Sequence, residues 1–529
     1  MPAQDSLPMP TPRKVLFISA DQWRGECLSA VGHPLIRTPH LDALAADGVL
    51  FGKHFTVTSP CGPSRASLQT GLYLMNHRSG RNGTPLDRRH TNIAQEVRKI
   101  GLNPMLFGYT DTSADPRGLD PQDPVLRTYE GPLPGYSVGL LFPDYMAAWM
   151  TDLRRKGYQF QGRQDVYQPR PGFEKPANRG HRFVPTLYKA EDSDTRFMTR
   201  AVLDWLSDHR DQDWFMHCVF LRPHPPVITP EPYNALYDPA DVALPRRKAT
   251  AQEEAAQHPH LAEWIRTFQR PGKYDEHNPN NMVDMPELEL RQMRACYYGM
   301  INEVDDAVGE LVAHLKATGE YAHTLIVFTC DHGEMGGDHY TWGKELYFDQ
   351  SFHIPLIIRD PCQTADSARG RKVAAFTESV DLMPTLLDWL GAEIPAQCDG
   401  RSLRTFLEGR SPARWRQEAH MELDFRTSPH SSFAGQTALG LEPDACQLAI
   451  LRGERWKYVH FAALPPLLFD LHNDPWEMQD LSRDPAHQGV LLEMAQKMLS
   501  WRLIQQEHVL TNLHNGPQGV EDRRLQRLD

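Results

Sequence analysis

The sequence predicts an α/β protein with a mostly parallel, doubly wound sheet and a small antiparallel sheet subdomain near the C-terminus. Short, largely apolar runs alternate with helical patterns up to about residue 410, which is typical of successive strand–helix–strand units. Beyond that point the pattern changes to paired strand-like runs around a turn. The 529 residues, 40% of them hydrophobic, are sufficient for a large core.

The predicted strands are apolar at nearly every position, as expected where helices cover both faces of a parallel sheet. The first of them, KVLFISA at 14–20, ends directly before Asp21. Runs of the same kind occupy 102–109, 213–221, 323–330 and 352–360. Ligands of open α/β sheets usually bind at the carboxyl ends of such strands, so the residues that follow them are candidates for a site.

The segments between these strands carry apolar residues at helical spacing. The predicted helices cover 91–101, 194–209, 286–319 and 379–391. Residues 120–190 are rich in proline, glycine and aromatic residues and have no strong period. We therefore predict that they form a loop-rich insertion that wraps the core.

The C-terminal part has a different pattern of apolar and polar residues. Residues 446–462 are expected to form a β-hairpin around the turn RGER, followed by a helix over 488–505 and a polar tail. The predicted organisation is a flexible N-terminus over 1–12, a catalytic domain over 13–410 and a C-terminal subdomain over 411–529.

Composition excludes several classes of protein. The net charge of −12 argues against a nucleic-acid partner, because phosphate binding needs a basic face. The eight cysteines are scattered without C-x-x-C spacing, which argues against a zinc knuckle or a disulfide framework. The apolar run near the N-terminus is too short for a signal peptide, and no stretch approaches the roughly 20 apolar residues of a membrane span. We expect a cytoplasmic protein with free thiols and no membrane partner.

Polar residues follow two predicted strands, and a cysteine loop follows a third apolar run. Asp21-Gln22 and Asp331-His332 come directly after strands, and the loop with Cys61 follows GVLFGKHFT. Because the carboxyl ends of parallel strands meet at one edge of a sheet, we expect these residues to converge. Two carboxylates, an amide oxygen and an imidazole together make a divalent-cation site.

A second motif is a false match. Gly343-Lys344 resembles the end of a phosphate-binding loop, but the required upstream glycine is missing and Glu345 stands where that loop has serine or threonine. We reject the motif. Lys344 is still expected to reach the metal site, because its loop follows directly from Asp331-His332.

The stretch CGPSRASLQTG, residues 61–71, resembles the sulfatase signature C-x-P-x-R-x-x-x-x-T-G. The segments RPHPP (222–226), DHGE (331–334) and CDGRSL (398–403) also resemble segments of that family. The resemblance extends over about residues 13–515, and it is closest to the phosphonate monoester hydrolases of the sulfatase/alkaline phosphatase superfamily.

The resemblance implies that a formylglycine-generating enzyme, as a transient partner, oxidises Cys61 to formylglycine, whose hydrate is the nucleophile. A geminal diol is better suited than a thiol to attack a sulfuryl or phosphoryl centre. The resemblance also implies roles for other residues. The metal would be bound by Asp21, Gln22, Asp331, His332 and the modified Cys61, and the ionised diol would be steadied by Arg65. Charge at the leaving oxygen would be stabilised by His224, the general acid, and by Lys344. The substrate would be contacted by Asn82 and Tyr109.

Two positions depart from the usual sulfatase pattern in the metal site. The first strand is followed by Asp-Gln instead of Asp-Asp, and His332 stands where many sulfatases have asparagine. The first change removes an anionic oxygen ligand, and the second replaces an oxygen ligand with a nitrogen. They favour Mn²⁺ over Ca²⁺ for the single divalent ion, with Zn²⁺ and Mg²⁺ as further alternatives.

Asp111 is a third departure, and it bears on the substrate. Its position resembles threonine in phosphonate monoester hydrolases and histidine in many sulfatases, where the histidine deprotonates the second diol hydroxyl. A carboxylate could do the same, and it would disfavour dianionic phosphomonoesters by like-charge repulsion. A simple turn role is the alternative.

The resemblance therefore implies a metal- and formylglycine-dependent hydrolase of monoanionic esters. Asp111 gives a narrow preference for sulfate esters, with phosphonate monoesters and phosphodiesters as promiscuous substrates, whereas the chain-long likeness favours a phosphonate monoester hydrolase. Two rival interpretations are a metallo-phosphotransferase with an unmodified Cys61 and a non-catalytic oxyanion-binding protein. Relatives form dimers and tetramers, so we expect a homodimer or a homotetramer.

Overall fold

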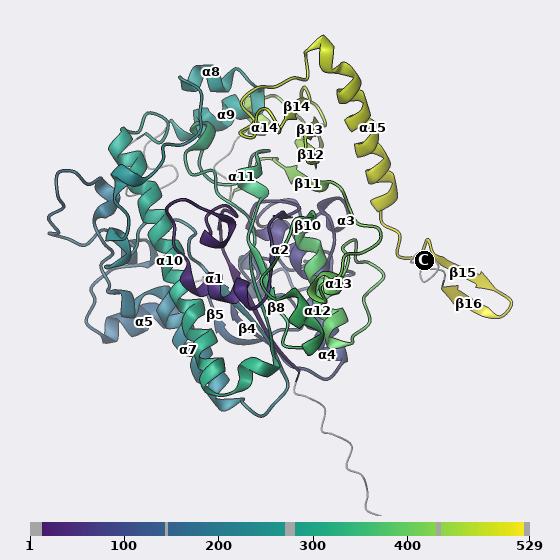
Figure 1. The fold of residues 1–529 in the computed structure, drawn as a ribbon, viewed down its shortest axis with the longest axis horizontal. Helices are drawn as coiled ribbons and strands as arrows, with labels where there is room; N and C mark the ends of the chain where they lie inside the picture. Colours follow the sequence, from purple (N-terminus) through teal and green to yellow (C-terminus); the bar gives the residue numbers. More distant parts are fainter. Residues whose placement is uncertain (1–12, 143–145, 270–280, 430–434, 523–529) are drawn as a thin grey trace, which may run out of the picture.

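The structure, a computed structural model, describes residues 13–142, 146–269, 281–429 and 435–522; the predicted flexible N-terminus (1–12) lies outside these ranges. Its centre is an eight-stranded sheet with the order β5-β4-β6-β1-β7-β8-β2-β9. Helices surround this sheet (Figure 1). The strands are β1 (Lys14–Ala20), β2 (Val49–Phe51), β4 (Pro104–Gly108), β5 (Ser137–Leu141), β6 (Trp214–Phe220), β7 (Thr324–Cys330), β8 (Leu356–Arg359) and β9 (Arg371–Val373). Strand β8 runs antiparallel to β7 and β2, and the other neighbours are parallel. The predicted mostly parallel sheet is confirmed.

The central three strands end side by side. Ala20, the last residue of β1, is in register with Phe220 of β6 and with Cys330 of β7. Because the three strands are parallel, the segments that follow them leave the sheet at the same edge. This register places Asp21 next to Asp331, as predicted.

Helices cover both faces of the sheet, which makes the fold doubly wound. Leu16 and Ile18 of β1 belong to the core that contains α7 (Asp194–Asp208) and α10 (Glu287–Ala317). The alternate residues Val15 and Phe17 belong to the core that contains α4 (Ile93–Lys99) and α12 (Leu382–Leu390). The helices predicted in these four segments are confirmed. Within the described residues, no helix combines the length and apolar character that crossing a membrane requires.

The segment 120–190 is only partly the insertion that we predicted. It contains the short helices α5 (Ala147–Arg155) and α6 (Arg163–Val166), but also β5, which pairs parallel with β4 and forms one edge of the main sheet. Strand β5 is only partly buried, and Val138 is 44% exposed. An edge strand of five residues with a glycine in its centre has no continuous apolar pattern, which explains why the sequence analysis missed it.

The C-terminal subdomain is a four-stranded antiparallel sheet, as predicted. Its strands are β11 (Ala419–Asp424), β12 (Gln447–Arg452), β13 (Trp456–Phe461) and β14 (Leu467–Asp470). The predicted hairpin is β12–β13. Helix α15 (Gln488–Gln505) packs Met494 and Met498 against one face of this sheet.

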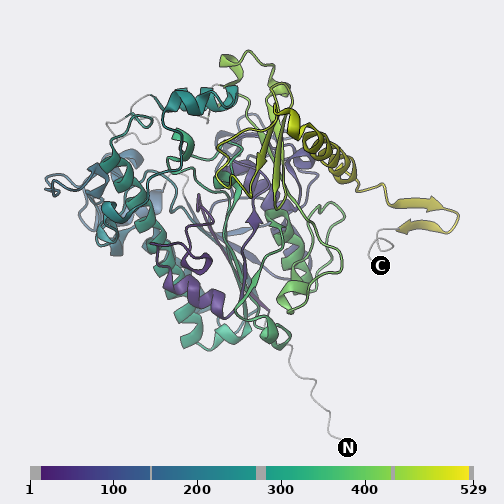
Figure 2. The same cartoon turned by 45° about the horizontal axis from the view of Figure 1, so that its top comes forward.

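The segment after α15 differs from the predicted polar tail, because it contains a second hairpin. Strands β15 (Leu513–Gly516) and β16 (Gly519–Asp522) pair antiparallel and project away from the body of the protein (Figures 1 and 2). The outer side of α15 carries exposed Leu492, Leu499 and Leu503.

Candidate active site

Cys61 is the first residue of helix α2 (Cys61–Thr70), whereas the sequence analysis placed it in a loop. Prolines at the N-cap and in the first turn, Pro60 and Pro63, gave the loop-like pattern. Proline is tolerated there because the first N–H groups of a helix have no intrahelical partner. Cys61 thus lies at the positive end of the helix dipole. Burial, and then the Asp21 carboxylate, raise the pKa of its thiol well above the usual range, which leaves little thiolate in the metal-free protein.

Four predicted metal ligands converge on one buried cluster. The ligand atoms of Asp21, Cys61, Asp331 and His332 all lie within 4.8 Å of one another. His332 Nε2 is 3.1 Å from Cys61 Sγ, 3.6 Å from Asp21 Oδ1 and 3.5 Å from Asp331 Oδ2. Burial and the charge of Asp331 raise the pKa of Asp21. A divalent cation fits this set, because it would neutralise two buried carboxylates that otherwise repel each other.

Gln22 and Lys344 complete the predicted metal side of the site. The backbone N–H of Gln22 donates to Asp331 Oδ1 at 3.0 Å, and Gln22 Oε1 accepts from Lys344 Nζ at 2.5 Å. Burial opposes the charge of Lys344, but Cys61 and Asp21 raise its pKa overall. The ammonium group therefore stays positively charged beside the cluster.

Arg65 is one helical turn after Cys61 and lies on the same side of α2. Its Nη2 donates to Asp21 Oδ2 at 2.9 Å, and its Nε donates to Asp331 Oδ2 at 3.0 Å. Nη1 donates to the carbonyl of Tyr109 at 3.1 Å. Arg65 was predicted to steady the nucleophile. The structure shows that it bridges the two carboxylates of the cluster, so that it holds them in place as well.

The two predicted substrate contacts, Asn82 and Tyr109, both lie at the cluster. Asn82 Oδ1 accepts from the N–H of Gly62 at 2.8 Å, directly beside the nucleophile position. The hydroxyl of Tyr109 donates to Asp21 Oδ2 at 2.6 Å, and the side chain is 1% exposed. Tyr109 therefore holds the carboxylate of Asp21, one of the predicted metal ligands, in place.

Asp111 has a left-handed backbone, with φ of 48°, and its side chain is 5% exposed. Its Oδ2 is 3.7 Å from Arg65 Nε. Burial raises the pKa of Asp111 well above the usual range, with Arg65 opposing the shift and Asp21 and Glu130 adding to it. Aspartate adopts this conformation more often than most residues other than glycine, so the backbone by itself fits the turn alternative. The burial of the carboxylate beside Arg65 distinguishes Asp111 from a residue of a surface turn.

His224 lies near Lys344, as expected. Burial and the charge of Lys344 lower its pKa well below the usual range. Its Nδ1 is 2.7 Å from the carbonyl oxygen of Pro225 and donates to it. The other ring nitrogen, Nε2, is therefore the atom that can exchange a proton with a substrate.

Two residues that organise the site, Glu334 and Arg81, were not predicted from the sequence. Glu334 of the DHGE segment accepts a hydrogen bond from the Gln22 side chain. Arg81 forms an ion pair with Glu345, the neighbour of Lys344, at 2.6 Å, and donates to the carbonyl of Asp424 in β11 at 3.0 Å. The DHGE segment resembles the family, but its sequence alone assigns no role to Glu334. The Arg81 contacts join segments far apart in sequence, which no local pattern reveals.

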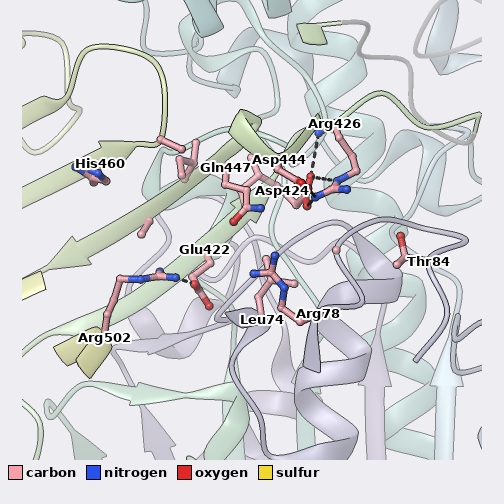
Figure 3. A pocket seen from close by; sticks show the side chains of 15 residues that line it. Leu74, Arg78, Thr84, Glu422, Asp424, Arg426, Asp444, Gln447, His460 and Arg502 are labelled. Carbon is pink, nitrogen blue, oxygen red and sulfur yellow. Dashed lines mark hydrogen bonds and ion pairs between the residues drawn. The ribbon is translucent and has the colours of Figure 1, made fainter. Parts of the chain in front are cut away.

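One pocket of about 440 Å³ lies apart from this cluster, between the turn after α3 (Leu74–His77) and strands β11–β13 (Figure 3). Its lining includes Arg78, Asp424, Arg426 and Arg502, and none of the predicted site residues. Arg426 is paired with Asp424 and Asp444, and Arg502 with Glu422. Because these opposite charges neutralise each other, the lining of the pocket has little net positive charge with which to bind an anion.

The comparisons with known proteins agree with this geometry. The profile of the sulfatase family matches residues 13–392, and that of the C-terminal part of N-sulphoglucosamine sulphohydrolase matches residues 337–504. The chain is 41% identical over 520 residues to the multifunctional alkaline phosphatase superfamily protein PehA of Trinickia caryophylli, covering 97% of this chain and 99% of PehA.

Two solved structures have nearly the same fold. The phosphonate monoester hydrolase of Agrobacterium radiobacter is 44% identical with a TM-score of 0.91, and the match covers 97% of this chain and all of that one. The phosphonate monoester hydrolase of Silicibacter pomeroyi is 43% identical with a TM-score of 0.89, and the match covers 97% and 99% of the two chains. The chain is an ester-hydrolysing enzyme and belongs to the sulfatase family.

Proposed function

We propose that the protein is a metal- and formylglycine-dependent hydrolase of monoanionic esters, with phosphonate monoesters and related phosphodiesters as its first substrate class. The observation that carries this proposal is the position of Cys61, at a helix N-terminus and 3.1 Å from His332 within the buried ligand cluster. The full-length likeness to two phosphonate monoester hydrolases supports the substrate class. For this reason we place phosphonate monoesters before the sulfate esters that Asp111 favours.

The family implies two groups that complete the site. Formylglycine at position 61 would supply, as its hydrate, a hydroxyl nucleophile and a route to release the product by elimination. A divalent metal would neutralise the anionic ligands and the charge of the substrate. Asp21, Gln22, Asp331 and His332 would hold this metal, and we propose Mn²⁺ because Gln22 replaces a carboxylate and His332 replaces an amide oxygen of the usual ligand set.

The chain's own residues bind and orient the ester. Lys344 provides a fixed positive charge beside the cluster, and Asn82 holds the first turn of α2 through Gly62. His224 Nε2 is the atom that exchanges a proton with the leaving oxygen. The charge of a bound anionic substrate raises the pKa of this imidazole, which favours the protonated form that a general acid needs.

The role of His224 predicts a leaving-group effect. The His224→Ala variant should lose more rate on esters with poor leaving groups than on esters with good ones, up to about 10²–10⁴-fold. The measurement is kcat for a series of aryl esters with graded leaving-group pKa, in which the slope of log kcat against pKa should steepen. An unchanged slope would assign His224 to charge stabilisation alone.

Aryl sulfates are the second candidate class, and Asp111 is the observation that favours them. If Asp111 deprotonates the second hydroxyl of the diol, its raised pKa makes it a stronger base than an exposed carboxylate. The Asp111→Ala variant should then give a burst of leaving group followed by a slow steady rate, measured by stopped-flow absorbance.

A different result would identify Asp111 as a charge filter. In that case the variant gains activity on dianionic phosphomonoesters relative to monoanionic diesters, without a burst. Asp111→Asn, which keeps the shape of the side chain, is the matched variant. If neither a burst nor a changed substrate ratio appears, Asp111 has only a structural role, and sulfate esters lose their main support.

We also propose that the protein is a cytoplasmic homodimer or homotetramer whose subunits meet through α15 and the hairpin β15–β16. All eight cysteines are free, which fits a reducing compartment. Leu492, Leu499 and Leu503 are each 61% exposed on α15, and Val520 of the hairpin is 67% exposed. An isolated two-stranded hairpin is marginally stable in water, so one that projects from its own subunit needs a partner surface.

Truncation tests this assembly. Deleting residues 506–529 should lower the mass measured by light scattering to that of a smaller assembly, because the hairpin and its apolar side chains are lost. The full-length protein is the control. The same number of subunits in the two proteins, or a monomeric full-length protein, would contradict the proposed interface.

A further inference from the structure

We infer that Glu334 is a positioning residue that fixes the orientation of the Gln22 carboxamide, so that its oxygen is the end available to a metal. This inference rests on the proposed metal dependence. Glu334 is 2% exposed and lies three residues after Asp331. Its two oxygens make different contacts: Oε2 accepts from Gln22 Nε2, and Oε1 accepts from the backbone N–H groups of Gly336 and Gly343, each at 2.8 Å.

The neighbours of Gln22 allow only one orientation of its amide. A carboxamide has a donor end and an acceptor end of nearly equal size. The ionised Glu334 can only accept a hydrogen bond, whereas the ammonium group of Lys344 can only donate one. Gln22 therefore turns its NH₂ group to Glu334 and its oxygen to Lys344, at 2.5 Å. The reversed amide would place donor against donor and acceptor against acceptor.

The backbone of Gln22 is fixed independently, which leaves the amide as the remaining degree of freedom. Its N–H donates to Asp331 Oδ1 at 3.0 Å, and its carbonyl accepts from the Tyr297 hydroxyl at 2.8 Å. Its φ of 68° is left-handed, a conformation that a side chain other than glycine adopts only when the surroundings hold it. An asparaginyl or glutaminyl ligand binds a cation through oxygen alone, so an amide that rotates freely would be a weaker ligand.

Glu334 has a second effect, on the turn that carries Lys344. Glu334 accepts hydrogen bonds from the backbone N–H groups of Gly336 and Gly343. The same turn is closed by a backbone hydrogen bond, in which the N–H of Met335 donates to the carbonyl of Gly343 at 2.9 Å. The single carboxylate thus links the Gln22 amide to the turn that ends at Lys344. A purely structural role in closing this turn is the competing interpretation.

The Glu334→Gln variant separates the two roles. Glutamine keeps an oxygen that can accept from the two glycine N–H groups, so the turn can persist. Its NH₂ group cannot accept from Gln22, so the orientation of the amide is lost. We expect the dissociation constant for Mn²⁺ to rise about 10–100-fold, as is typical when a group that orients a metal ligand is changed. The readout is calorimetric titration of metal-free protein with Mn²⁺ alone.

A reciprocal exchange provides the rescue. In Gln22→Glu alone, two carboxylates face each other and we expect impaired binding. In the double variant Gln22→Glu with Glu334→Gln, the new amide can donate to the new carboxylate, so binding should recover above both single variants. Such non-additivity is the signature of a direct interaction between the two side chains.

A matched control tests the turn by itself. Glu254→Gln weakens the buried contact of Glu254 with His339, 2.8 Å long and in the same turn, without touching Gln22. It should change the thermal stability of the metal-free protein and leave the Mn²⁺ dissociation constant within about twofold, since the ion-pair partner of Glu254 is His339 and not a ligand of the cluster.

The outcomes are distinct. The positioning role would be overturned if Glu334→Gln bound Mn²⁺ as tightly as the wild-type protein. It would also be overturned if Glu254→Gln lost as much Mn²⁺ affinity as Glu334→Gln. Either result would leave the proposed function standing. The absence of rescue in the double variant would count against a direct contact with Gln22. If the wild-type protein binds no divalent cation, the proposed function fails first and the inference fails with it.

Discussion

Replacing Cys61 with alanine is expected to lower kcat by about 10³-fold or more, because nucleophile deletions in comparable enzymes have effects of this size. The thiol packs at the N-terminus of α2 and makes no structural bridge, since all eight cysteines are free. The folded state should therefore persist, with a loss of stability of about 1 kcal/mol. The measurement combines steady-state kinetics on an aryl phosphonate monoester with circular dichroism of the same preparation.

Two controls make the Cys61 result specific. Cys218→Ala removes a buried thiol from the middle of β6 and should keep most of the activity. Cys61→Ser should lose nearly as much as Cys61→Ala in a host whose converting enzyme accepts only cysteine. Retention of most of the activity in purified Cys61→Ala would exclude position 61 as the nucleophile.

Removal of the divalent metal is expected to abolish turnover and to destabilise the protein. Without a cation, Asp21 and Asp331 repel each other in a buried site, and the charges of Arg65, Lys344 and His332 only partly offset this repulsion. Binding at a free metal concentration of 100 times the dissociation constant would add about 2.7 kcal/mol to the free energy of unfolding. Activity and thermal unfolding should both recover on addition of metal.

The choice of ion follows from the ligands. Mn²⁺ should restore activity more fully than Ca²⁺, because Gln22 and His332 replace carboxylate or amide oxygens of the usual set. Elemental analysis of protein as purified is the check. Full activity with calcium at full occupancy would contradict the proposed preference, and full activity after chelation would contradict metal dependence altogether.

Much of the scaffold could be predicted because its physical cause is local. Strands β1, β6 and β7 are buried at every position and mostly apolar since helices cover both faces of the sheet, and such runs are visible in sequence. Asp21 and Asp331 could be placed together because parallel strands end at one edge. The hairpin β12–β13 was predictable from its turn and flanking runs.

Other features depend on contacts that a linear pattern does not encode. Helix α2 begins at Cys61 because prolines are compatible with a helix N-terminus, although the same residues also suit a loop. Strand β5 is short and at the edge of the sheet, and Arg81 joins a loop near Asn82 to Glu345 across a long stretch of chain. The role of Glu334 depends on which end of the Gln22 amide faces it, which only the three-dimensional arrangement reveals.

The unmodified thiol and the formylglycine form of the enzyme differ in one direct observable, the mass at position 61. Conversion of the thiol to an aldehyde lowers the mass by about 18 Da, which intact-mass spectrometry and the peptide containing Cys61 both resolve. The account predicts that active protein carries this loss, reacts with a hydrazide probe at residue 61, and has a kcat proportional to the converted fraction. A fully active protein whose Cys61 peptide retains the mass of an unmodified cysteine would contradict it.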